Sequence, residues 1–402
     1  MSGAAAPADQ MWRRNLAALW FAQLTAIFGF SFAFPFIPLY LRELGVREPA
    51  SLAVWTGLAS GASGLALAVM SPIWGALADR FGRKSMLLRA MVGASISLGL
   101  MGFARGPLDL LVLRFVQGAT SGTIAAATAL VASGTPRPRV GWALGVLSSA
   151  VAVGSALGPV MGGVAASLIG LRQVFWAGCV LLLVAAVPVL LLVREVPRSA
   201  SKQSAERPLD LLRAAPGTLS SIVALTVCQA LLQTSYVGFQ PLVVLRLLER
   251  LSGGTAEVTG LAFGAAGLAS ALAAVLVAGW VRRFGYRGVA VAAALLLGAC
   301  ELCSGWAPAV GLIVAGAALA GAFYGALAPA LSTMIGLETP PQIQARIFGF
   351  SSSATAIGFA AGPFGGGLAA ARLGSTLAVS ACAGAALALA AVLALSVREP
   401  RS

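Results

Sequence analysis

The sequence predicts an all-α membrane protein with twelve transmembrane helices in two pseudo-symmetric six-helix bundles. Only 10% of its 402 residues are charged, whereas a soluble domain carries about 25%. The mean hydropathy is +0.91, so a soluble fold could not cover its own surface. With roughly 20 apolar residues for each span and a few more for each loop, the length accommodates about twelve spans. A sequence repeat relates the two halves.

Apolar runs separated by short polar loops define the spans. The first run follows Trp12-Arg13-Arg14 and has no small-residue cleavage site after it, so we expect an uncleaved first span and not a signal peptide. The predicted spans are 16–41, 52–77, 86–104, 108–132, 141–168, 172–193, 219–245, 258–281, 288–306, 308–335, 347–371 and 374–396.

The longest polar stretch lies between the sixth and seventh spans and divides them into two groups of six. Residues 209–213 within it could form an interfacial helix, but a linker with a helical patch is our preferred interpretation. The predicted parts are a cytoplasmic N-terminus (1–15), a first bundle (16–193), a cytoplasmic linker (194–218), a second bundle (219–396) and a cytoplasmic C-terminus (397–402).

The basic residues predict the orientation. With the N-terminus in the cytoplasm, 19 of the 27 Lys and Arg fall on the inner side and 7 on the outer side. The positive-inside rule therefore predicts that both termini are cytoplasmic. The net charge of +14 reflects this topology; basic runs with interleaved aromatic residues are absent, so we expect no nucleic-acid partner.

Four patterns recur at an offset of 203 or 204 residues. They are Phe36-x-Pro38-Leu39 with Phe239-x-Pro241-Leu242, Gly118-x-x-x-Gly122 with Gly321-x-x-x-Gly325, Gly154-x-x-x-Gly158-Pro159-x-x-Gly162-Gly163 with Gly358-x-x-x-Gly362-Pro363-x-x-Gly366-Gly367, and Phe81-Gly82 with Phe284-Gly285. Two six-span halves of parallel topology are typical of a rocking transporter with its site between the halves.

Three motifs resemble those of the major facilitator superfamily. They are the loop after span two, Gly75-Ala76-Leu77-Ala78-Asp79-Arg80-Phe81-Gly82-Arg83-Lys84, then Arg114-Phe115-Val116-Gln117-Gly118, and the Gly154–Gly163 pattern associated with its antiporters. Residues 35–40 and 44–45 are similar to the twelve-span drug–proton antiporters of that superfamily. The resemblance covers the whole chain. It implies a multi-pass protein of the bacterial cytoplasmic (inner) membrane that exports lipophilic or amphiphilic drug-like compounds in exchange for protons by alternating access.

The first motif is a candidate conformational latch. Asp79 can pair with nearby arginines and face the positive end of another helix, which by resemblance is span eleven near Arg346. The alternative is that the basic residues only anchor the loop in the cytoplasm. The second half lacks the acid, so the latch would be one-sided. The latch residues are Gly75, Asp79, Arg80, Gly82, Arg83 and Lys84.

Candidates for proton coupling are Arg114, Gln117 and Glu301. Arg114 lies within an apolar run, where an arginine costs on the order of 3 kcal/mol, so it should face the bundle interior beside Gln117; snorkelling to the outer headgroups is the alternative. Glu301 is a candidate proton carrier because intramembrane carboxyl groups mark proton relays; solvation at the outer interface is the alternative. Many such antiporters keep an acid in span one, which here has only Gln23 and Thr25.

Two helix faces are candidates for lining the substrate cavity. Gln229, Gln233, Tyr236 and Gln240 share one face of span seven, and Gln23, Phe30 and Phe34 share one face of span one. Amides and aromatic rings suit a lipophilic or weakly polar ligand; interhelical hydrogen bonding and packing are the alternative. Gly154, Gly158, Pro159, Gly162 and Gly163 are expected to pack span five against a partner helix and seal the cavity.

The motifs that are absent exclude other classes. The sequence has no phosphate-binding loop, no nucleophile elbow and no histidine, which argues against an ATP motor and against a membrane enzyme. We expect no cofactor and no metal, and a monomer whose partners are a small-molecule substrate, protons and the lipid bilayer. The alternatives are a superfamily transporter of a small metabolite, such as a sugar or amino acid, and a non-transporting membrane protein.

Overall fold

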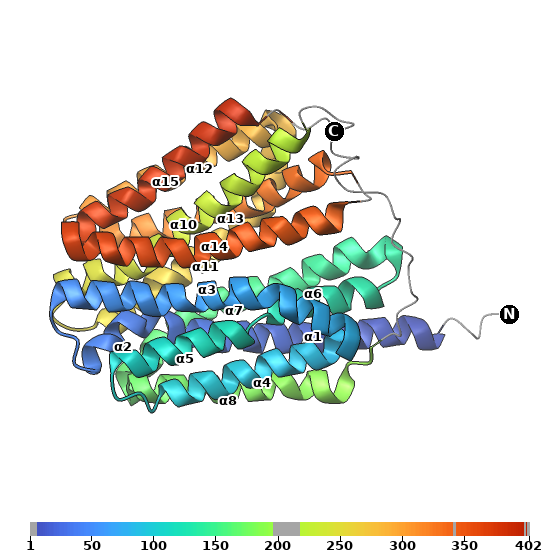
Figure 1. Cartoon of the computed structure of the whole chain (residues 1–402), viewed down its shortest axis with the longest axis horizontal. Coiled ribbons are helices and arrows are strands. Elements are labelled where there is room, and N and C mark those ends of the chain that lie inside the picture. Colours follow the sequence, from blue (N-terminus) through green and yellow to red (C-terminus); the bar gives the residue numbers. More distant parts are fainter. Residues whose placement is uncertain (1–5, 196–217, 341–342, 398, 400–402) are drawn as a thin grey trace. The chain divides into compact units, whose positions relative to one another are not determined.

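A computed structural model describes residues 6–195, 218–340, 343–397 and 399. In this part of the chain the regular structure is helical throughout (Figure 1). Twelve stretches are long and apolar enough to cross a membrane, which confirms the predicted number of spans. The predicted interfacial patch at 209–213 lies outside the described residues, as does most of the linker.

The helices are numbered in Figure 1. Their bounds are α1 Ala6–Ala33, α2 Ile37–Glu43, α3 Pro49–Phe81, α4 Arg83–Met101, α5 Pro107–Thr120, α6 Thr123–Gly134, α7 Val140–Ile169, α8 Leu171–Leu192, α10 Thr218–Arg250, α11 Thr255–Phe284, α12 Tyr286–Trp306, α13 Val310–Glu338, α14 Gln344–Leu373 and α15 Ser375–Ser396.

The chain divides into two compact units. The first contains Met1–Gly45, Ala66–Ser199 and Ala256–Gly264, and the second contains Val46–Leu65, Ala200–Thr255 and Ala265–Ser402. The first part of α3 therefore groups with the second unit, and the first part of α11 groups with the first.

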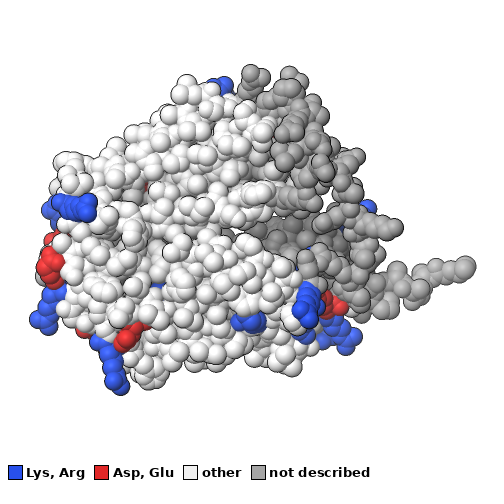
Figure 2. All heavy atoms as spheres, viewed as in Figure 1, with Lys and Arg blue, Asp and Glu red and all other residues white. Residues whose placement is uncertain are grey.

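The outer surfaces of the helices are apolar. Large apolar side chains point outward, as at Leu168, Val275 and Leu395, which are 77%, 77% and 86% exposed. Most of the charged side chains visible in Figure 2 lie near helix ends, and much of the surface between them carries no charge. Helices that are apolar on both faces belong in a bilayer, where lipid covers the outer face.

The helices of two spans are interrupted, one at prolines and one at a glycine with positive φ. The first continues from α1 to α2 through a 3-10 turn at Phe34–Phe36, since Pro35 and Pro38 lack the N–H that a regular helix needs. The fourth, predicted as one run, breaks between α5 and α6 at Gly122, whose φ of +127° suits only glycine. Its counterpart α13 is continuous.

Glycines let helices approach closely in both units. A Cβ atom at Gly154 would lie 2.9 Å from the Leu24 carbonyl oxygen of α1, and one at Gly158 would lie 2.6 Å from the Ser31 Cβ. Gly162 makes the same approach to α1, and Gly163 meets Ala256 within the same unit. In the second unit, Gly358 and Gly362 of α14 contact α10 in the equivalent way. The repeated glycine pattern thus builds matching helix contacts.

Candidate functional site

A buried carboxyl group lies within the second unit. Glu301 of α12 is 0% exposed, and the Ser235 hydroxyl of α10 lies 2.9 Å from its Oε1 and 2.8 Å from its Oε2. Ser235 is also 0% exposed. The interpretation that Glu301 is solvated at the outer interface is therefore wrong, because its face of α12 packs into the unit.

This environment suits an exchangeable proton. Among the residues that the structure describes, no ion pair involves Glu301. Burying an ionised carboxylate without a cation costs several kcal/mol, whereas a protonated carboxyl group can donate to the Ser235 hydroxyl. The protonated form of Glu301 therefore fits this buried site better than the ionised form.

The polar face of α10 contacts α13 and α14. The Gln229 amide donates to Ser332 at 3.1 Å, and its oxygen accepts from Ser351 at 3.0 Å and from Thr355 at 2.9 Å. Gln229 thus joins α10 to α13 and α14.

Tyr236 lies further along the same face of α10 and contacts Tyr324 of α13. Tyr236 stacks on Tyr324 with ring centroids 4.1 Å apart, and Gln233 donates to the Tyr324 hydroxyl at 3.2 Å. Because Ser235 and Tyr236 are consecutive, this aromatic and amide cluster adjoins the buried carboxyl group.

The first unit buries the intramembrane arginine. Arg114 is 5% exposed and donates to the Gln117 side-chain oxygen at 2.7 Å. Its guanidinium lies 4.4 Å from the Phe34 ring centroid, and Phe34 contacts Phe30. Burial shows that Arg114 does not snorkel. The structure therefore brings four predicted residues together on α1, the turn that follows it, and α5.

Gln23 lies elsewhere on α1 and is only 1% exposed. Neither its amide nitrogen nor its oxygen has a hydrogen-bond partner among the described residues, and neither does the Gln117 amide nitrogen. An unsatisfied buried polar group costs about 1–3 kcal/mol. Such groups are therefore candidates for binding a polar group of a ligand.

The loop after span two is held by an acid that the sequence analysis missed. Gly82 turns the chain with a φ of +88°, and Glu195 then accepts the Arg83 and Lys84 backbone N–H groups at 2.7 and 3.1 Å. In the second unit, Glu399 accepts the Tyr286 and Arg287 N–H groups at 2.6 and 2.9 Å. A carboxylate at a helix N-terminus is stabilising.

The predicted latch itself stays a prediction. The side chains of Asp79 and Arg346 lie outside the described residues. Arg83 donates to the Ala129 carbonyl at 2.7 Å, and Lys84 donates to the Leu190 carbonyl at 2.9 Å. Gly75 and Arg80 are exposed. Arg83 and Lys84 thus bind backbone carbonyls within the first unit.

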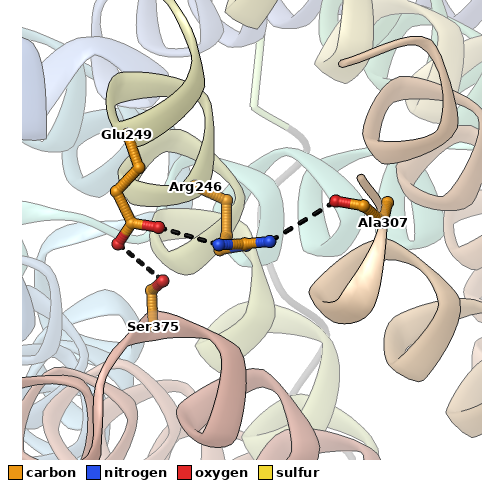
Figure 3. Close-up of polar contacts among 4 residues, drawn as sticks. All are labelled: Arg246, Glu249, Ala307 and Ser375. Atoms are coloured by element: carbon orange, nitrogen blue, oxygen red, sulfur yellow. Dashed lines mark hydrogen bonds and ion pairs between the residues drawn. The ribbon is translucent and has the colours of Figure 1, made fainter. Parts of the chain in front are cut away.

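A second buried arginine lies at the other end of α10. Arg246 was counted as a loop residue, but α10 continues to Arg250, and Arg246 is only 6% exposed. Its guanidinium donates to Glu249 at 2.8 Å and to the Ala307 carbonyl at 3.5 Å, and Glu249 accepts from Ser375 at 2.6 Å (Figure 3). The cluster joins α10 to the end of α12 and the start of α15.

The sequence profile of the Major Facilitator Superfamily matches residues 19–245 and 225–402. The chain belongs to this superfamily. It is 32% identical over 382 residues to multidrug resistance protein MdtG of Proteus mirabilis, with 92% of each chain covered. It is 35% identical over 379 residues to the MdtG protein of Serratia proteamaculans, covering 92% of this chain and 90% of the relative.

Solved structures share the superfamily fold. The human organic anion transporter MFSD10 matches with a TM-score of 0.68 at 21% identity, covering 95% of this chain and 99% of that chain. The nucleoside transporter NupG matches with a TM-score of 0.73 at 13% identity, covering 94% and 98%. These likenesses confirm the predicted fold. As a superfamily member of the MdtG type, the chain is a membrane transporter and not an enzyme.

Several residues of the candidate site in this superfamily transporter were not predicted from the sequence. They are Ser235, Tyr324, Ser332, Ser351 and Thr355, and the capping acids Glu195 and Glu399. Ser235 lies on α10 but its partner Glu301 does not, and the other hydroxyl residues come from α13 and α14, whose pairing with α10 the sequence does not encode locally. The two acids do leave a signal, because Val193-Arg194-Glu195 recurs as Val397-Arg398-Glu399 at the repeat offset of 204.

Proposed function

We propose that this protein is a proton-coupled exporter of lipophilic or amphiphilic drug-like compounds in the bacterial inner membrane. It works by alternating access, with both termini in the cytoplasm. The relatives named multidrug resistance protein MdtG, at 32% and 35% identity, support the substrate class. The excess of Lys and Arg in the predicted inner loops supports the orientation. Proton coupling rests on one observation, the buried Glu301–Ser235 pair.

Glu301 is the proposed proton carrier. When protonated, its carboxyl group fits the dry site against Ser235. When Glu301 loses the proton, its negative charge favours a conformation in which water or a cation reaches the carboxylate. The proton thereby biases the equilibrium between two conformations, which is what an antiporter needs.

The substrate is proposed to contact aromatic and amide groups. The first unit offers Phe30 and Phe34 beside Arg114 and Gln117, and the second offers the α10 face around Tyr236. Aromatic rings bind an apolar body, and amides orient a few polar groups. This combination favours uncharged or weakly polar amphiphiles.

A transporter of a small metabolite with a carboxylate, such as an amino acid, is the second candidate function. It is favoured by Arg114, since a buried guanidinium matches a carboxylate in geometry and charge.

Transport assays with purified protein in proteoliposomes test both candidate functions, multidrug export and metabolite transport. An imposed proton gradient should drive uphill accumulation of a lipophilic fluorescent dye, and the dye should also exchange across the membrane without a gradient. Glu301→Gln should abolish the uphill component and keep the exchange, because only coupling is removed. Glu257→Gln is the matched control, since Glu257 is an exposed acid in the first turn of α11.

Three results decide the matter. Uphill transport that survives Glu301→Gln places the proton elsewhere. Loss of exchange together with uphill transport makes Glu301 structural. If wild-type protein moves no dye in either mode but exchanges amino acids, the metabolite function replaces the multidrug one.

A further inference from the structure

A cavity of about 700 Å³ opens in the first unit where α1 and α7 begin. Three tryptophans line it, namely Trp12 and Trp20 of α1 and Trp142 of α7. Two arginines complete its wall: Arg13 of α1, and Arg139 in the turn that precedes α7. The proposed transport function uses none of these residues.

The tryptophans form a firm apolar wall. Trp12 is 5% exposed and meets Trp142 edge-on, with ring centroids 6.4 Å apart and planes at 88°. The Trp20 indole N–H is held by the Ser149 hydroxyl at 3.0 Å. Trp142 is 64% exposed and so leaves one apolar surface open to a ligand.

The two guanidinium groups lie beside the same ring. The Arg13 and Arg139 Cζ atoms are 5.5 and 5.6 Å from the Trp12 ring centroid. A cation–π contact uses the flat face of a guanidinium, while its N–H donors lie along the edge and match phosphate oxygens. Two guanidinium groups on an apolar wall therefore offer N–H donors to an anion that is joined to an apolar body.

The place of the cavity along the helices indicates the source of that anion. Its residues lie at or near the starts of two membrane spans, Met11–Glu43 and Arg137–Ile169. Tryptophan and arginine at span ends sit at the level of the lipid headgroups, and basic pockets between membrane helices bind anionic headgroups. The volume is that of a site for a molecule of drug size, larger than a free phosphate ion needs.

We propose that this cavity binds the headgroup of an anionic phospholipid from the surrounding membrane. Arg13 and Arg139 bind the phosphate, and the exposed face of Trp142 contacts the glycerol and the first acyl carbons. Its lining includes none of the residues proposed for transport, so lipid binding should not depend on substrate.

Native mass spectrometry of the full-length protein tests the site by counting bound lipids. The lipid titrated in is phosphatidylglycerol, with phosphatidylcholine and inorganic phosphate as the other arms. Phosphatidylglycerol should bind at one site in preference to both. Arg13→Gln and Arg139→Gln should each weaken it about fivefold, since each basic residue near a membrane surface contributes a factor of this order.

Arg14→Gln and Arg137→Gln are the matched controls, since they remove the same charge from neighbours outside the cavity. Trp142→Ala, a change at a side chain that is 64% exposed, should also weaken binding. Equal binding of phosphatidylcholine, displacement of the lipid by inorganic phosphate or by a lipophilic cation, or equal losses in the control variants would each overturn the proposal.

Discussion

The hydrogen bond between Ser235 and Glu301 gives the sharpest test of the fold around the site. Both residues are 0% exposed, and the hydroxyl lies 2.9 and 2.8 Å from the two carboxyl oxygens. Ser235→Ala removes the partner while water has no access. We therefore expect it to lower the free energy of unfolding by about 1–3 kcal/mol, the cost of an unsatisfied buried group.

A double-mutant cycle isolates that bond. In the Glu301→Met background the carboxyl group is gone, so Ser235→Ala should cost close to nothing. The coupling between the two changes should therefore be about 1–3 kcal/mol. Equilibrium unfolding in mixed micelles, followed by tryptophan fluorescence, measures all four proteins. Ser97→Ala is the control, because the buried Ser97 hydroxyl donates to the Gly93 carbonyl of its own helix and to no other group in the described part of the chain.

The reasoning fails if Ser235→Ala costs the same with and without the carboxyl group. Equal costs would mean that the serine stabilises α10 by itself. The carboxyl group would then have to be satisfied by another partner.

Three further predictions follow from contacts described above. Gly158→Leu should prevent α7 from packing on α1 and abolish the peak of folded protein in size-exclusion chromatography, whereas Gly145→Leu, in open space, should leave the peak unchanged. Arg246→Gln should lower the free energy of unfolding by about 2–3 kcal/mol because charge-assisted hydrogen bonds are lost; Arg250→Gln at an exposed site should change it by less than about 0.5 kcal/mol in the same denaturation assay. Arg114→Lys should reduce dye transport at least tenfold without loss of folded protein, since an ammonium cannot reproduce a planar group that lies against Phe34 and bonds to Gln117; unchanged transport in proteoliposomes would assign this arginine no role.

The spans could be predicted because a bilayer leaves few choices. Every backbone group must be satisfied within the helix, so each crossing needs a long apolar run that a reader of the sequence can count. The polar face of α10 could also be predicted from the sequence, because Gln229, Gln233 and Tyr236 recur at helical spacing. Such periodic signals lie within one element and need no knowledge of its neighbours.

Features that join separate elements could not be read in this way. Ser235 and Glu301 are 66 residues apart, and no local pattern pairs them. Arg246 seemed to belong to a loop because a charge inside a helix is costly, yet Glu249 and the Ala307 carbonyl satisfy it. In both cases the deciding partner comes from the packed structure.

The capping acids have a practical consequence for cutting or tagging this transporter. Glu195 follows the last turn of α8 by three residues, and Glu399 follows that of α15 by three. A fragment boundary drawn at the end of the visible helix would delete an acid that holds the start of α4 or α12, which lies more than 100 residues earlier in the chain. Split versions of the protein should therefore keep Val193-Arg194-Glu195 attached to the first six spans, and carboxy-terminal fusions should keep Val397-Arg398-Glu399 ahead of the fused segment.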